Sequence, residues 1–229
     1  MKKLLAIVAV LVITAIAAYF MLQNPLGRLV KIAVEEFGPE MTQATVKVSK
    51  VEISATDGRG ALSRLFLGNP KGFKSDYALK AGTVEIELEP ASLAKDVIVI
   101  HKILIDAPQI GYEKADGITN FDAIQRNVEE YLGAKGGKSE KSKQSSKKMI
   151  IDSFVIRNAK VNYNGMLELT LPDIELHNVG KKTGGATSAQ VVKAIIAELN
   201  TKLALALAKA AVAGVVVGAG AAIKNLFGK

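Results

Sequence analysis

The sequence predicts an α+β fold: an N-terminal transmembrane helix, then a curved, mostly antiparallel β-sheet with a long C-terminal helix packed on its apolar face. Three observations lead to this prediction. The chain begins with a long charge-free apolar run, its middle alternates apolar and polar residues with a period of two, and its last forty residues follow a helical pattern.

The N-terminal apolar run is long enough to cross a membrane. Leu4 to Leu22 are nineteen residues without a charge, and about 20 apolar residues span a bilayer. The lysines at positions 2 and 3 place the start of this run in the cytoplasm, so the rest of the chain would be exported. Ala15-Ile16-Ala17 also resembles a signal-peptide cleavage site, but we favour an anchor over residues 1–23 because the run continues to Leu22.

An amphipathic helix is predicted over residues 24–38. Asn24 and Pro25 fit a helix start, and Gly38-Pro39 fits a helix stop. One stripe of this helix is apolar, so it either lies on the bilayer surface or covers an end of the following sheet. The residues predicted to contact the membrane are Leu26, Leu29, Val30 and Phe37.

Residues 39–180 are predicted to form the sheet domain. The clearest strand is Thr83 to Glu89, in which Val84, Ile86 and Leu88 alternate with three glutamates, as in a sheet with one solvated face. A parity change at Ser49-Lys50 indicates a bulge. Further strands are predicted at 61–67, 97–105, 109–112, 149–157, 160–162, 166–171 and 174–179.

The second half of this domain contains a helix, a lysine-rich loop and a hairpin. The helix is predicted from Asn120 to about Leu132, and residues 133–148 form a flexible loop with six lysines and one glutamate. This loop is either an ordinary solvated loop or one attracted to anionic lipid. Asn164-Gly165 predicts a type I′ turn, after which Leu167, Leu169 and Leu171 share one face.

The C-terminal hydrophobic helix is predicted over residues 187–229. Thr187 and Gln190 fit a capping box, and from Leu203 to Ile223 the only charge is Lys209. Three arrangements are compatible with this pattern: a second span, a helix embedded against a membrane, and a helix on the apolar face of the sheet, which we favour. The small residues predicted to allow close helix packing are Gly214, Gly218 and Ala222.

Composition argues against several classes of function. The chain has no cysteine, which excludes disulfides and thiolate chemistry. The lysine-rich loop supplies +5 of the net charge of +8, and aromatic residues are scarce, so nucleic-acid binding is not expected. His101 and His177 lack partners nearby in sequence, and no phosphate-binding or serine-nucleophile motif is present. We therefore expect no catalytic residue, no metal, no cofactor and no enzymatic activity.

Several short blocks between about Leu26 and Leu199 are informative: Val51-Glu52-Ile53-Ser54, Gly58 to Ser63, Leu67 to Phe73, Ile174 to Gly180, and Gly184-Gly185. In their order, these blocks resemble the AsmA-like family of Gram-negative envelope proteins. The resemblance implies a single N-terminal anchor and a periplasmic sheet related to the bridge-like lipid-transfer and TamB-type proteins, whose concave face holds acyl chains. It also implies a role in outer-membrane lipid homeostasis. A sheet this narrow would not bridge two membranes unaided.

These observations define the functional hypotheses. The first is a module in the bacterial inner membrane, with one span and its bulk in the periplasm, that binds or shields lipid acyl chains. The alternative is a non-enzymatic scaffold that binds another envelope protein. The residues predicted to contact acyl chains are Val84, Ile86, Leu88, Leu167, Leu169 and Leu171.

Overall fold

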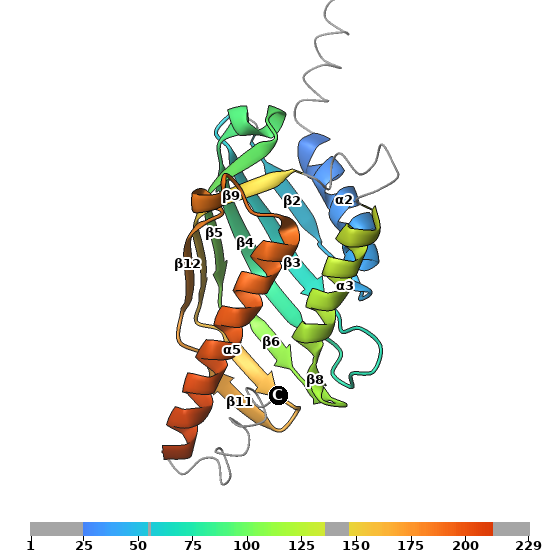
Figure 1. Ribbon diagram of the computed structural model, residues 1–229, viewed down its shortest axis with the longest axis vertical. Helices are drawn as coiled ribbons and strands as arrows, with labels where there is room; N and C mark the ends of the chain where they lie inside the picture. Colours follow the sequence, from blue (N-terminus) through green and yellow to red (C-terminus); the bar gives the residue numbers. More distant parts are fainter. Residues whose placement is uncertain (1–24, 55, 136–146, 213–229) are drawn as a thin grey trace, which may run out of the picture.

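The computed structural model describes residues 25–54, 56–135 and 147–212, and it confirms an α+β fold (Figure 1). A curled, mostly antiparallel sheet carries three α-helices, α2, α3 and α5, on one of its faces. The anchor expected over residues 1–23 and the packing residues Gly214, Gly218 and Ala222 lie outside the described residues. Within the three described ranges, no helix combines the length and the apolar character that crossing a membrane requires.

The helices alternate with groups of strands along the chain. The α-helices are α2 (Pro25–Thr42), α3 (Asn120–Lys135) and α5 (Ser188–Val212), and the short 3₁₀ helices are η1 (Pro90–Ala94) and η2 (Lys181–Thr183).

Ten strands form the main sheet and two form a small separate hairpin. The main sheet contains β1 (Val46–Lys47), β2 (Lys50–Ile53), β3 (Arg59–Leu67), β4 (Leu79–Leu88), β5 (Val97–Asp106), β6 (Gln109–Tyr112), β9 (Lys148–Arg157), β10 (Lys160–Tyr163), β11 (Leu167–Thr170) and β12 (Ile174–Val179). The hairpin is β7 (Lys114–Ala115) with β8 (Ile118–Thr119).

Several neighbouring strands continue one another across a break. β5 and β6 both pair with β4. Next to them, β9 pairs with β5 and β10 pairs with β6. At the edge of the sheet, β12 pairs with β9 and β11 pairs with β10. The breaks are aligned: Ala107 and Asn158 both have positive φ, and the Ala107 N–H donates to the Arg157 carbonyl at 2.9 Å. The sheet therefore consists of long bent strands lying side by side.

The two central lines of this sheet are parallel. β5 pairs with β9 in parallel and β6 pairs with β10 in parallel, while all other pairs in the sheet are antiparallel. The connection between them runs through the hairpin and α3, as a parallel pairing requires a long crossover. The prediction of a mostly antiparallel sheet is thus confirmed, but the sequence pattern gave no sign of this parallel centre.

One row of side chains crosses the sheet and forms the middle of its core. Its members are paired in register from β2 to β12, and all are buried: Val51, Leu62, Val84, Ile105, Ile156 and Ile174. Helix α5 packs on the β12 side of this core with its own buried residues, Val191, Ile196, Leu199, Leu203 and Leu207. Of the three arrangements considered for the C-terminal helix, residues up to Val212 adopt the one on the apolar face of the sheet.

Two local predictions on turns and caps are confirmed. Asn164 and Gly165 have φ angles of 52° and 71°, as a type I′ turn requires. At the start of α5, the Thr187 N–H donates to Gln190 Oε1 at 2.9 Å, and the Gln190 N–H donates to Thr187 Oγ1 at 3.3 Å. These reciprocal bonds are the predicted capping box.

The predicted end of the first helix was wrong. α2 continues through Gly38 and Pro39 to Thr42, and the Gln43 N–H donates to the Pro39 carbonyl at 2.9 Å. Gly38 packs so closely on β1 that an added Cβ would lie 2.9 Å from Val46 Cβ. Packing against the sheet therefore overrides the helix-breaking tendency of Gly-Pro. Two smaller differences are that α3 reaches Lys135 and β4 begins at Leu79.

Candidate functional site

The face of the sheet that carries the helices is only partly covered. A second row runs in register from Ile53 through Gly60 and Ile86 to Ile103, and Leu88 pairs with Ile100 one step further along the strands. The five apolar side chains of this group are half-buried. We call the surface formed by Ile53, Gly60, Ile86, Leu88, Ile100 and Ile103 the apolar trough.

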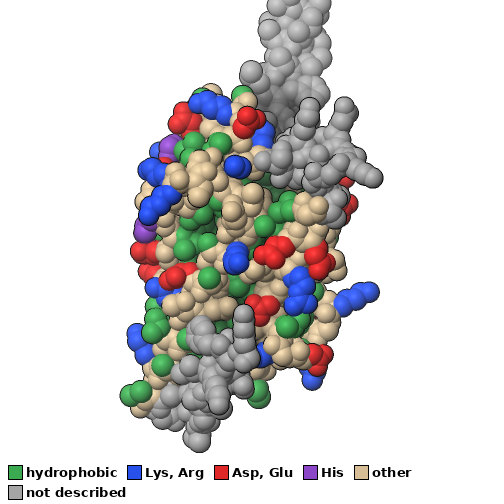
Figure 2. All heavy atoms as spheres, in the orientation of Figure 1, with side chains coloured by type: hydrophobic (Ala, Val, Ile, Leu, Met, Phe, Trp, Pro, Cys, Tyr) green, Lys and Arg blue, Asp and Glu red, His purple; other side chains and the backbone are tan. Residues whose placement is uncertain are grey.

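The positions of the helices explain why the trough is only half-covered. α5 contacts β12 and β11, and α2 contacts β1 and β2. On β9, towards α5, the residues that pair with Ile103 and Ile100 are Phe154 and Ile151, and both are buried. Between these two helices the second row on β4 and β5 has less cover, and Figure 2 shows apolar side chains at the surface between α5 and α2.

Gly60 makes the trough deeper at its β3 position. It contributes no side chain to the row between Ile53 and Ile86. An added Cβ would lie 3.3 Å from both Glu52 O and Ile53 Cγ1. A depression of about 400 Å³ lies here, lined by Glu52, Ile53, Ser54, Arg59, Gly60 and Ala61.

The six residues predicted to contact acyl chains do not form one surface. Ile86 and Leu88 lie in the trough, whereas Val84 is buried in the core. Leu167 on β11 is half-buried, while Leu169 and Leu171 are buried. β11 is separated from β4 by β10 and β6, so these three leucines contribute to a different part of the core.

The residues predicted to contact the membrane all lie on α2. Val30 packs against the core of the sheet domain, and Phe37 is partly exposed. Leu26 and Leu29 belong to the first turns of the same helix. The Glu35 carboxylate accepts a hydrogen bond from the Val48 N–H at 3.1 Å, which fixes α2 on the sheet. Of the two roles considered for this helix, the structure shows the cover over one end of the sheet.

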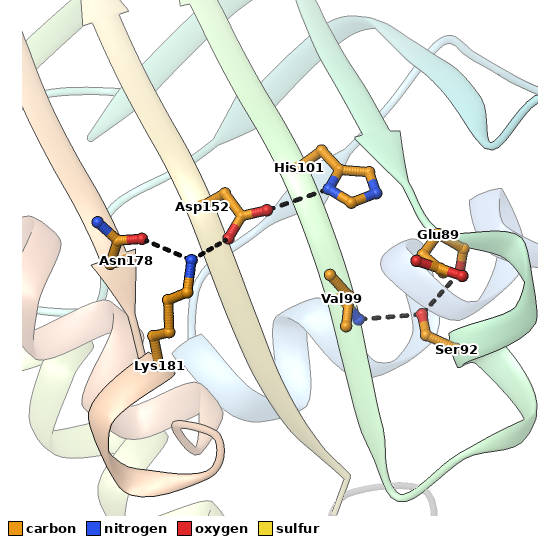
Figure 3. Close-up of polar contacts among 7 residues, drawn as sticks. All are labelled: Glu89, Ser92, Val99, His101, Asp152, Asn178 and Lys181. Atoms are coloured by element: carbon orange, nitrogen blue, oxygen red, sulfur yellow. Dashed lines mark hydrogen bonds and ion pairs between the residues drawn. The ribbon is translucent and has the colours of Figure 1, made fainter.

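The opposite face of the sheet carries a row of polar side chains that the sequence did not reveal (Figure 3). His101 Nδ1 lies 3.0 Å from Asp152 Oδ2, and Lys181 Nζ lies 3.7 Å from Asp152 Oδ1. Lys181 also donates to Asn178 Oδ1 at 3.2 Å. Three adjacent strands meet here, and the ladder skips a pair at His101 and Asp152.

The partner of His101 could not be found from local sequence. Asp152 is 51 residues away and becomes its neighbour only because β5 and β9 pair in parallel. For His177 the expectation of no partner nearby in sequence was wrong, because its Nε2 lies 3.6 Å from Oε2 of Glu175, two residues earlier on the same strand. His101, His177 and Glu175 are exposed to solvent, and Asp152 is half-buried. In the portion of the chain that the structure describes, no three His, Asp or Glu side chains converge on a possible metal position.

A buried polar network fixes the loop between β3 and β4 to the start of α3. Asn120 donates to Asn69 Oδ1 and to the Gly111 carbonyl, both at 2.7 Å, and accepts from the Glu113 N–H at 3.1 Å. Burial alone would raise the pKa of Glu113. The N–H groups of Lys74 and Ser75 and the Ser75 hydroxyl outweigh this effect and hold that pKa below its usual value.

A buried tyrosine connects the same region to the C-terminal helix. Burial raises the pKa of Tyr112, so its hydroxyl stays protonated and donates to Asn200 Oδ1 at 2.7 Å. Its ring stacks between Phe121 and Tyr163. These polar groups are structural partners of one another, and none of them contacts a trough residue through these bonds. No family model matches the chain, and no curated protein is significantly similar to it.

Proposed function

We propose that this protein is an inner-membrane-anchored periplasmic module that binds lipid acyl chains in the apolar trough and contributes to lipid homeostasis of the cell envelope. The observation that carries the proposal is the half-exposed second row of the sheet, from Ile53 to Ile103. An apolar surface of this kind gains free energy when an apolar partner displaces water from it.

The trough is about as long as one acyl chain. It crosses four strands, β2 to β5, and three interstrand spacings of about 4.8 Å give about 14 Å. The hydrocarbon core of a bilayer is about 30 Å thick, so each leaflet contributes chains of about 15 Å. Each buried methylene group contributes about 0.8 kcal/mol, so covering five of them would contribute about 4 kcal/mol.

The position of the trough in the molecule also supports the proposal. Ile53 and Leu88 are the last residues of β2 and β4, so the trough lies towards the end of the sheet at which α2 begins (Figure 1). The predicted anchor, residues 1–23, directly precedes α2 in the sequence. An anchored domain would therefore have its trough towards the bilayer, where acyl chains are available. The sequence resemblance to the AsmA-like family agrees with this role.

Native mass spectrometry of the detergent-extracted full chain tests the proposal. The wild type should retain phospholipid under gentle activation, and the double variant Ile86→Gln/Ile100→Gln should lose most of it because two amides would lie in the trough. The matched control is Val99→Gln/Ile150→Gln. Val99 and Ile150 are also half-buried, and they pair with each other outside the apolar core of the helix-bearing face.

The control should retain lipid as the wild type does. Equal loss from both double variants would show that lipid binds outside the trough. A wild-type protein that carries no lipid would sink the proposal and favour the alternative, in which another envelope protein covers the trough.

A further inference from the structure

One end of the molecule combines an exposed leucine with several lysines. η1, the start of β9 and η2 lie together at this end (Figure 1). Leu93 in η1 is 43% exposed, although it is a large apolar side chain. Isolated exposed leucines are common, so the significance of Leu93 depends on how it is held and on what surrounds it.

Leu93 is presented by a rigid turn. The preceding residue, Ser92, is fully buried; its hydroxyl donates to the Glu89 carbonyl at 2.6 Å and accepts from the Val99 N–H at 2.9 Å (Figure 3). The Lys95 N–H closes the turn by donating to the Ser92 carbonyl at 2.9 Å. η1 is thus fixed to β5, and the exposure of Leu93 follows from the fold.

Cationic side chains surround this turn. Lys147 Nζ donates to the Leu93 carbonyl at 2.6 Å, and Lys148 pairs with Val97 at the start of β5. Gly185, next to η2, packs on Lys148: an added Cβ would lie 2.6 Å from Lys148 Cβ. The lysines of this end are Lys95, Lys147, Lys148, Lys181 and Lys182, and the nearby acidic residues are Glu89, Asp96 and Asp152.

Two helix ends also lie at this end of the molecule. α2 begins here at Pro25, next to the predicted anchor, and α3 ends here at Lys135 (Figure 1). The opposite end of the sheet is up to about 50 Å away, because β9, the two-residue break and β10 extend over sixteen residues at about 3.3 Å each. The hairpin tip at that far end carries Met166, which is 84% exposed.

We propose that this end is a membrane-docking surface: Leu93 enters the interfacial region of an anionic bilayer, and the surrounding lysines contact its lipid headgroups. The inference rests on the membrane anchoring in the proposed function and adds the orientation of the domain. A rigid apolar side chain among cations is the combination that interfacial binding requires. The Debye length at physiological salt is about 8 Å, so the lysines attract anionic headgroups when the predicted anchor before Pro25 holds this surface close to the bilayer.

A single-cysteine labelling experiment tests this orientation, because the natural chain has no cysteine. Full-length Leu93→Cys and Met166→Cys are each labelled with an environment-sensitive dye and reconstituted into nanodiscs containing phosphatidylglycerol. We expect emission from position 93 to shift to shorter wavelength and to be quenched by spin-labelled lipid at least about threefold more than emission from position 166. Equal quenching at both positions would overturn the inference and leave the lipid-retention test of the trough unaffected.

Charge reversal provides a second measurement that does not depend on the dye at position 93 alone. Lys95→Glu/Lys182→Glu should reduce quenching at position 93 in anionic nanodiscs, whereas the control Lys71→Glu/Lys160→Glu, away from this end, should not. No effect of the first pair would overturn the role of the lysines. A protein that does not associate with nanodiscs at all would count against the anchor and therefore against both proposals.

Discussion

The side chain of Asn120 joins the start of α3 to the nearby chain around Gly111 and to Asn69, which is 51 residues away in the sequence. It is fully buried and makes three hydrogen bonds, two as a donor and one as an acceptor. Its partners belong to the loop after β3, to β6 and to the turn before β7. A buried amide of this kind stabilises a fold mainly because removing it leaves its partners without hydrogen bonds.

Replacing Asn120 should therefore be costly. We expect Asn120→Ala to lower the free energy of unfolding by about 2–3 kcal/mol, because Asn69 Oδ1, the Gly111 carbonyl and the Glu113 N–H lose their partner. Urea unfolding followed by circular dichroism measures this change. Asn162→Ala, at an exposed position of β10, is the control and should change stability by less than about 0.5 kcal/mol. Equal effects of the two variants would contradict a role of the network in stability.

Glu113 makes the stability depend on pH. Its folded-state pKa is lowered from the ordinary value of 4.5, so its contribution to stability is fully present above about pH 4.5. That contribution is lost as the pH falls through the lower pKa of the folded state. Urea midpoints measured across this range should fall more steeply for the wild type than for Glu113→Gln, which has no charge to lose. The exposed Glu130→Gln should keep the wild-type profile, and a parallel profile for Glu113→Gln would refute the assignment.

At the scale of single elements, features that depend on residues close in sequence were predicted correctly, and a feature that depends on a distant strand was not. The type I′ turn at Asn164-Gly165 and the capping box at Thr187 depend on neighbours within a few residues, and both were predicted correctly. The end of α2 was not, because its continuation past Pro39 depends on packing against Val46 of a separate strand. At this helix end, tertiary packing overrode a local stop signal.

The same glycine-to-alanine change should have opposite effects in two elements. Gly165 has a φ of 71° and nothing within 4 Å of an added Cβ, so Gly165→Ala should cost about 1–2 kcal/mol purely through backbone strain. Gly133 lies in α3, also with nothing within 4 Å of an added Cβ, so Gly133→Ala should stabilise by about 0.5–1 kcal/mol. Thermal unfolding of both variants tests the pair. A gain in melting temperature for Gly165→Ala would contradict the assigned turn.

At the scale of the whole molecule, the sequence predicted the layers but not the pairing at their centre. Alternating residues predicted a one-sided sheet, and the glutamates after Val84 are indeed solvated. The parallel pairing of β5 with β9 spans 51 residues and leaves no local pattern. The trough depends on the antiparallel register of β2 to β5 and on the spacing of α2 and α5. Sequence reasoning therefore named Ile86 and Leu88 but missed Ile53, Ile100 and Ile103.

The position of α5 decides whether the C-terminal helix is part of the core or a removable cover. Leu203 and Leu207 are fully buried, and Asn200 accepts the hydrogen bond of Tyr112. Losing one such leucine costs about 2–5 kcal/mol, and an average domain is stable by only about 5–15 kcal/mol. A chain truncated after Leu199 should therefore lose its cooperative thermal transition, whereas one truncated after Val212 should keep it. If the shorter chain instead unfolds cooperatively near the wild-type temperature, the second half of α5 is a displaceable cover, and the lipid-binding surface would extend beneath it to Leu169 and Leu171.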